Sequence, residues 1–170
     1  MGQVEKPTMI AVKTLLFVIF VPGSVTVLIP YWLYPSNIVD YPVSLGIFRY
    51  LGIIPILVGV PIYLKCAWDF TFTGQGTPAP IDPPKVLVAK GFYRHVRNPM
   101  YVGVVMQLFG EAWLFESAII LLYAAALLLG FHLFVVFYEE PILTRKFGDS
   151  YIQFCKTVPR WIPNIKSFKQ

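Results

Sequence analysis

Charged residues are scarce in this chain of 170 residues: Asp, Glu, Lys and Arg make up 14% of it, whereas 56% of the residues are apolar. A water-soluble domain of this length needs more polar surface, so the composition excludes an ordinary soluble globular protein. The apolar residues also form blocks as long as a bilayer crossing. We therefore predict an all-α integral membrane protein.

Cysteine and histidine are scarce as well. Cys66 lies in an apolar block and Cys155 in a basic tail, so no disulfide framework is predicted. His95 and His132 have no cysteine nearby in sequence, which argues against a metal site. The net charge of +5 is divided between a loop and the tail instead of forming one basic stripe, so nucleic acid is not an expected partner.

Four apolar blocks are each predicted to span the membrane within a single membrane domain: residues 14–34, 47–70, 99–115 and 118–138. The third is short and is expected to form a tight hairpin with the fourth through Glu116 and Ser117. Prolines interrupt the first two blocks, where we expect kinked but unbroken helices. The N-terminus resembles a secretory signal, but its apolar run continues to Tyr34 and favours a retained span.

Lys and Arg set the predicted orientation. They are missing from residues 35–48 and 111–117, and they are concentrated in the loop 71–98 and the tail 139–170. Basic segments remain on the cytoplasmic side, so both termini, the loop and the tail are predicted to be cytoplasmic. The membrane would be the plasma membrane, or the inner membrane in a prokaryote. Aromatic, basic and proline residues alternate in the loop and tail, which favours an ordered cap at the interface.

Two groups of polar residues could carry chemistry. Asn98 and Pro99 suit the N-cap and first position of a helix, and this alone explains them. Alternatively, the helix N-terminus with Arg97 forms an anion site that the Tyr101 hydroxyl can reach. The second group is at the end of the fourth block.

Glu139 and Glu140 follow the fourth block directly, where the helix dipole disfavours carboxylates unless a cation is bound. Solvated interfacial charges are the alternative. His132 lies seven residues before Glu139, about 10 Å away on the same helical face. It is either a functional ionisable residue or a neutral histidine satisfied by a neighbouring helix.

A series of short motifs occurs in one order: Gly74-x-Gly76-Thr-Pro-Ala-Pro, Leu87-Val88, Gly91-Phe-Tyr93-Arg94, Val96-Arg97-Asn98-Pro99-Met-Tyr101, Glu139-Glu140, Phe147-Gly148-x-x-Tyr151 and Val158-Pro-Arg-Trp-Ile-Pro163. In this order the chain resembles the isoprenylcysteine carboxyl methyltransferase family and its phospholipid methyltransferase relatives. The resemblance implies S-adenosylmethionine as cofactor. The contacts it implies are Lys85, Val86, Leu87, Val88, Tyr93, Asn98, Pro99, Met100, Tyr101 and Glu139.

The chemistry of these residues agrees with that cofactor. Glu139 can meet a cation, most plausibly the amino group, while Arg97 and the helix N-terminus can meet the carboxylate. The adenine is expected against Tyr93 and the apolar residues 86–88. Asn98 stands where the family commonly has histidine and keeps a polar side chain.

The resemblance predicts a membrane methyltransferase that acts on a lipophilic acceptor drawn from the bilayer. Isoprenylcysteine enzymes place an arginine where this chain has Val135, and that arginine holds the substrate carboxylate. Unless Arg97 or Arg160 replaces that arginine, an amine or thiol acceptor is favoured, with His132 as the candidate base. A non-catalytic lipid-binding or assembly protein is the alternative, and the joint presence of Tyr93, Asn98, Tyr101 and Glu139 speaks against it.

Overall fold

The computed structural model describes residues 7–36, 44–74 and 86–164, and every regular element within these ranges is helical. The first part contains α1 (Pro7–Gly23), a π-helical turn (Ser24–Leu28), α2 (Ile29–Leu33) and a 3₁₀ turn (Tyr34–Ser36). The second contains a 3₁₀ segment (Gly46–Gly52) and α3 (Ile53–Phe72). The third contains a 3₁₀ turn (Gly91–Arg94), α4 (Pro99–Leu114), α5 (Ala118–Phe134), a second π-helical turn (Val135–Glu139), α6 (Glu140–Phe147) and α7 (Asp149–Thr157). The predicted all-α class is confirmed for these residues.

Three stretches of continuous helix are long and apolar enough to cross a membrane: Met9–Leu33 with 25 residues, Gly46–Phe72 with 27 and Ala118–Phe147 with 30. They lie where three of the four spans were predicted. The remaining predicted span, the third at residues 99–115, corresponds to α4, whose 16 residues extend about 24 Å. α4 joins α5 through a short turn that contains Glu116 at a φ of 50° and Ser117 as the N-cap of α5.

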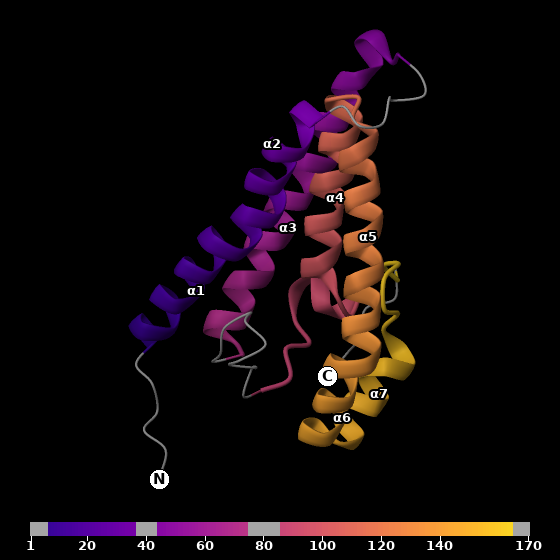
Figure 1. The fold of residues 1–170 in the computed structure, drawn as a ribbon. Coiled ribbons are helices and arrows are strands. Elements are labelled where there is room, and N and C mark those ends of the chain that lie inside the picture. The colour runs from indigo at the N-terminus through magenta and orange to yellow at the C-terminus, as the bar shows by residue number, and fades with distance from the viewer. Residues whose placement is uncertain (1–6, 37–43, 75–85, 165–170) are drawn as a thin grey trace.

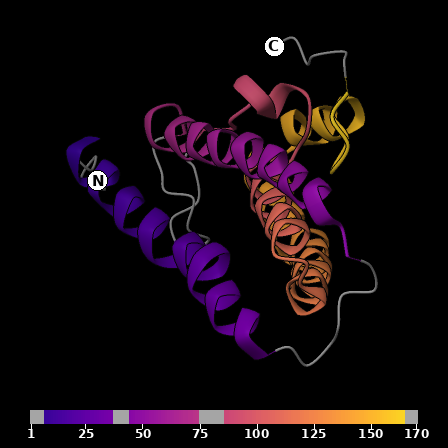
Figure 2. The same cartoon turned by 90° about the horizontal axis from the view of Figure 1, so that it is seen from above.

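Glycines bring α3 and α4 into the most extensive helix contact of the bundle. A Cβ atom at Gly59 would lie 2.5 Å from the Gly103 carbonyl oxygen, and one at Gly110 would lie 2.5 Å from the Gly52 carbonyl oxygen. These distances leave no room for any side chain, so the two backbones touch directly, as small residues permit in membrane helix packing. Figure 2 shows α3 crossing over α4, with α1 lying to one side.

Both π-helical turns end two residues before a proline, Pro30 in the first case and Pro141 in the second. A proline ring clashes with the preceding helical turn and has no N–H to donate, and a widened turn relieves that clash. The helices therefore pass through their prolines unbroken, as predicted. The second π-helical turn also carries the helix past residue 138 to Phe147, so Glu139 and Glu140 do not lie at a helix C-terminus as expected.

The tail after α5 is folded. Ala89, Tyr151, Phe154 and Val158 form a buried apolar cluster that joins α7 to the segment before α4. Figure 1 shows α6 and α7 gathered near the end of α5, on the same side as the start of α4. This agrees with the predicted ordered cap for the tail, while residues 75–85 of the loop lie outside the described residues.

Candidate active site

α4 begins at the predicted residues. The side chain of its N-cap residue does not, however, make the expected capping hydrogen bond. Asn98 is the N-cap residue and Pro99 the first helical residue, yet the Asn98 side chain makes no capping bond. Its Nδ2 instead donates to the carbonyl oxygen of Arg160 at 3.1 Å. The first turn of α4 therefore has no side-chain cap, which is the state in which a helix N-terminus can receive an anion.

Tyr101 and Glu139 are brought together from two helices. The Tyr101 hydroxyl donates to Glu139 Oε2 at 2.9 Å, and the Tyr101 ring packs on Phe131 with centroids 4.5 Å apart. Glu139 is the last residue of the second π-helical turn. Its other carboxylate oxygen, Oε1, receives no hydrogen bond from the described residues and is left to meet a ligand.

The neighbouring Glu140 has a different role, because it binds two arginines. Arg97 donates to Glu140 Oε1 at 2.7 Å, and Arg160 donates to both carboxylate oxygens at 2.8 and 2.9 Å. The hydrogen bond to Glu140 raises the pKa of Arg160 above its usual value. Arg97 also points a second donor at the Cys155 thiol, 3.1 Å away, and its Nε is buried without a partner. Two positive charges thus share one negative charge beside the start of α4.

The tail runs alongside the segment that precedes α4. The backbone N–H of Arg97 donates to Pro159, and that of Asn164 donates to His95, each at 2.8 Å. The indole N–H of Trp161 donates to His132 Nδ1 at 3.1 Å. The predicted neighbour of His132 is thus found, but it comes from the tail and not from another span.

The expected cofactor strip lies between α3 and the tail. Val86 is half exposed, whereas Val88 and Tyr93 are buried against Cys66 of α3. Burial raises the pKa of the Tyr93 hydroxyl well above its usual value, so it stays protonated. Lys85 lies outside the described residues.

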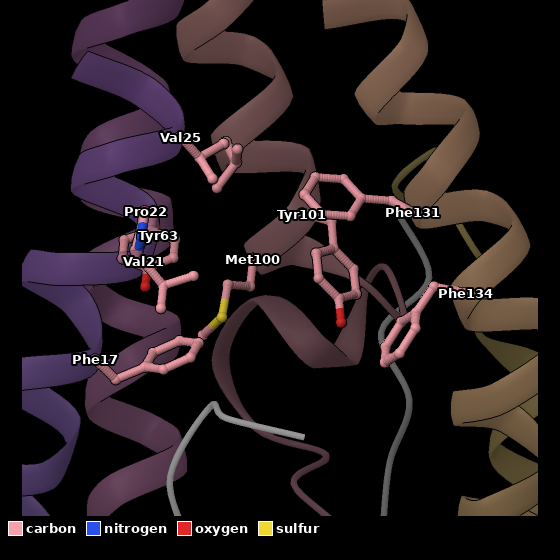
Figure 3. A pocket seen from close by; sticks show the side chains of 10 residues that line it. Phe17, Val21, Pro22, Val25, Tyr63, Met100, Tyr101, Phe131 and Phe134 are labelled. Atoms are coloured by element: carbon pink, nitrogen blue, oxygen red, sulfur yellow. The ribbon is translucent and has the colours of Figure 1, made fainter. Parts of the chain in front are cut away.

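An apolar pocket of about 380 Å³ opens beside Tyr101. Figure 3 shows Phe17, Val21 and Val25 of the first helical stretch on one side of it, and Tyr101 and Phe131 on the other. The Tyr101 hydroxyl, bonded to Glu139, gives the pocket a polar group at one edge, and apart from the Tyr63 hydroxyl the rest of the lining is mostly apolar. Such a site suits a ligand with a long apolar part and a polar head.

Trp161 had no predicted role, and Glu140 and Arg160 were named only as candidates and not among the predicted cofactor contacts. Each occupies one of the short motifs, so a signal was present. The motifs do not show which residue, distant in the sequence, each of these side chains contacts.

Three membrane-length helices and a polar cluster at the edge of an apolar pocket, all among the described residues, are the features of a helical membrane protein. The model of the phospholipid methyltransferase family matches residues 46–150, and the chain belongs to that family. A protein-S-isoprenylcysteine O-methyltransferase of Schizosaccharomyces pombe is 38% identical over 80 residues, which are 47% of this chain. The aligned part is 34% of that relative, so the chain matches about a third of its length. No solved structure matches the chain.

Proposed function

We propose that the protein is an S-adenosylmethionine-dependent methyltransferase that methylates a lipophilic acceptor within the membrane. The observation that carries this proposal is the position of the Tyr101–Glu139 pair. It lies where the apolar pocket meets the uncapped start of α4. A cofactor from the aqueous side and an acceptor from the lipid side would meet there.

The residues present fit this cofactor. The open Oε1 of Glu139 can accept a hydrogen bond from an ammonium group, and the uncapped turn of Pro99, Met100 and Tyr101 can receive a carboxylate. Val86 and Leu87 offer an apolar surface for an adenine, while Val88 and Tyr93 support that surface from the interior. Arg97 is held by Glu140, so it would act on the carboxylate through its charge and its unpaired Nε.

When bound, S-adenosylmethionine supplies an electrophilic methyl group on a sulfonium. The chain's own residues contribute orientation and exclusion of water. The pocket holds the apolar part of the acceptor so that its head lies beside Tyr101, and the tail segment 158–164 covers the polar side. Holding two reactants in line can supply much of the rate enhancement of such a transfer.

His132 is the proposed base for an amine or thiol acceptor. Because an indole N–H can only donate, the bond from Trp161 makes Nδ1 of His132 an acceptor and leaves the proton of the neutral ring on Nε2. His132 can therefore take up a proton only at Nδ1, after Trp161 withdraws. Departure of the tail from His132 would accompany each turnover.

The surroundings of Glu139 support our proposal for the acceptor class. Val135 is 1% exposed and supplies no positive charge. Arg97 and Arg160, which could replace the missing arginine, are both bound to Glu140. We therefore favour an amine or thiol acceptor over a prenylcysteine carboxylate.

The proposal includes the topology. α4 is taken as a fourth span, shorter than the others, and both termini, the loop 71–98 and the tail are placed in the cytoplasm. In a cysteine-free background, cysteines at Ser36 and Ser117 should react with an impermeant reagent from the non-cytoplasmic side. A cysteine at Ser167 should not react from that side, and the reverse pattern would refute this orientation.

The experiment that tests the function uses the whole chain in lipid nanodiscs. Cofactor carrying a labelled methyl group is supplied together with lipid, thiol or prenylcysteine pools. We expect labelled product from the lipid amine or thiol pool, and roughly tenfold less or lower from Glu139→Gln at limiting cofactor. Failure of the wild-type protein to bind the cofactor would refute the proposal, and methyl ester formation on a prenylcysteine would refute the acceptor class.

A further inference from the structure

The first π-helical turn leaves one backbone carbonyl without its helical donor. In this turn each N–H bonds the carbonyl five residues earlier, as the N–H of Ile29 does with Ser24. The next donor in that register would be residue 30, whose carbonyl partner is Val25. Residue 30 is proline and has no N–H, so the Val25 carbonyl must find another donor or remain unpaired in an apolar environment.

Tyr123 of α5 supplies that donor. Its hydroxyl bonds the Val25 carbonyl oxygen at 3.1 Å, across 98 positions in the sequence. Both residues also pack on the buried cluster that contains Leu108 and Ala124. This bond joins the first helical stretch to α5.

The bond is placed at one end of the apolar pocket. Val25 lines the pocket, and Figure 3 shows it at the end away from the Tyr101 hydroxyl. The polar edge with Tyr101 and Glu139 lies at the other side. A ligand whose head sits beside Tyr101 would direct its apolar chain toward Val25.

We propose that Tyr123 determines the length of the acceptor chain by fastening the Val25 carbonyl and so closing the far end of the pocket. The proposal rests on the function inferred above, because it takes the pocket as the acceptor site. Tyr123 acts as a specificity-determining positioning residue and does not touch the reacting atoms. Without its hydroxyl, the widened turn at residues 24–28 can move away from α5 and admit a longer chain.

The test measures chain-length preference by binding, independently of turnover. Geranylamine, farnesylamine and geranylgeranylamine, which carry the favoured amine head on chains of increasing length, are titrated into nanodiscs that contain the wild type or Tyr123→Phe. We expect the affinity for the longest chain, relative to the shortest, to rise about tenfold in Tyr123→Phe. Val25→Phe, which fills the same end, should shift the ratio in the opposite direction.

The matched control is Tyr31→Phe. Tyr31 is 72% exposed on α2 and belongs to the same helical stretch, so loss of its hydroxyl should leave the ratio unchanged. Spin labels at the exposed positions Val27 and Leu122 provide a second readout. Their distance distribution should broaden in Tyr123→Phe and stay narrow in Tyr31→Phe.

Two results would overturn the proposal: an unchanged chain-length ratio in Tyr123→Phe, or no binding of any chain by the wild type. Cofactor binding and methyl transfer to extracted lipid are measured on the same samples. Normal transfer with an unchanged ratio refutes the role of Tyr123 alone. Absence of cofactor binding refutes the proposed function, while the chain-length ratio still decides the role of Tyr123.

Discussion

The two π-helical turns have the same backbone form and the same spacing to a proline. They differ in whether the residues before that proline are apolar or acidic. When Ser24–Leu28 is superimposed in sequence on Val135–Glu139, the following prolines, Pro30 and Pro141, coincide. The two positions before each proline then differ in kind. In the first turn they are Leu28 and Ile29, and in the second they are Glu139 and Glu140.

In each case a tyrosine from another helix donates a hydrogen bond to a residue of the turn. Tyr123 donates to a backbone carbonyl in the first turn, and Tyr101 donates to the Glu139 carboxylate in the second. A proline follows each widened turn, although Pro22 and Pro61 lie within ordinary α-helix, and the side chains on each turn distinguish a pocket wall from a polar site. Four predictions test this difference between the two turns.

The largest effect is expected at His132, three residues before the second turn, where the first turn has Val21. If His132 is the base, His132→Ala should lower kcat by about 10² to 10⁴ with nearly unchanged cofactor affinity. Single-turnover kinetics and calorimetry measure the two quantities. Trp161→Phe is the control, because it removes only the donor to Nδ1. Equal, small losses in both variants would show that His132 serves only to hold the tail.

Glu140 comes next, because it neutralises two partly buried arginines whose side chains are 14% and 29% exposed. Glu140→Gln removes the charge and leaves both guanidinium groups poorly paired, which should destabilise the tail by about 2 to 3 kcal/mol. Faster hydrogen exchange in α7 and residues 158–164 would report this loss. Asp149→Asn, at an exposed acid in the first turn of α7, should change the exchange little. Equal protection from hydrogen exchange in both variants would contradict the role of Glu140 in stabilising the tail.

Glu139→Gln should weaken cofactor binding roughly tenfold or more, since a hydrogen bond to a charged group is worth about 1.5 to 3 kcal/mol. Tyr101→Phe should have a smaller effect, because it removes only the hydroxyl that orients Glu139. Titration calorimetry with the cofactor measures both. Unchanged cofactor affinity in Glu139→Gln would show that this residue is not part of the proposed site. The second turn would then have no binding role that the first turn lacks.

The smallest effect concerns the first turn. Pro30→Ala restores an N–H that can bond the Val25 carbonyl, and the Tyr123 hydroxyl then becomes redundant. Tyr123→Phe should cost about 1 kcal/mol of unfolding free energy in the wild type and almost nothing in the Pro30→Ala background. A double-mutant cycle by chemical denaturation in a lipid environment measures the difference. Additive costs would show that the proline does not create the need for Tyr123.

The positions of the helices could be predicted because they depend on local features. Apolar blocks placed three of the membrane-length helices, and Asn98 with Pro99 marked the start of α4. The helix C-terminus expected at Glu139 and Glu140 was wrong, because the end of an apolar block is not necessarily the end of a helix. A π-helical turn accommodates Pro141 and carries the helix onward to Phe147.

The family and its membrane character were determined by the sequence alone, because hydropathy and the order of short motifs are properties of neighbouring residues. Tertiary structure decided which groups, distant in the sequence, each polar side chain bonds to. Asn98 bonds the carbonyl of Arg160 instead of capping its own helix, and Arg97 bonds Glu140 across 43 positions. Adjacent Glu139 and Glu140 diverge because successive helical residues point about 100° apart, so each meets whatever long-range packing brings to its side.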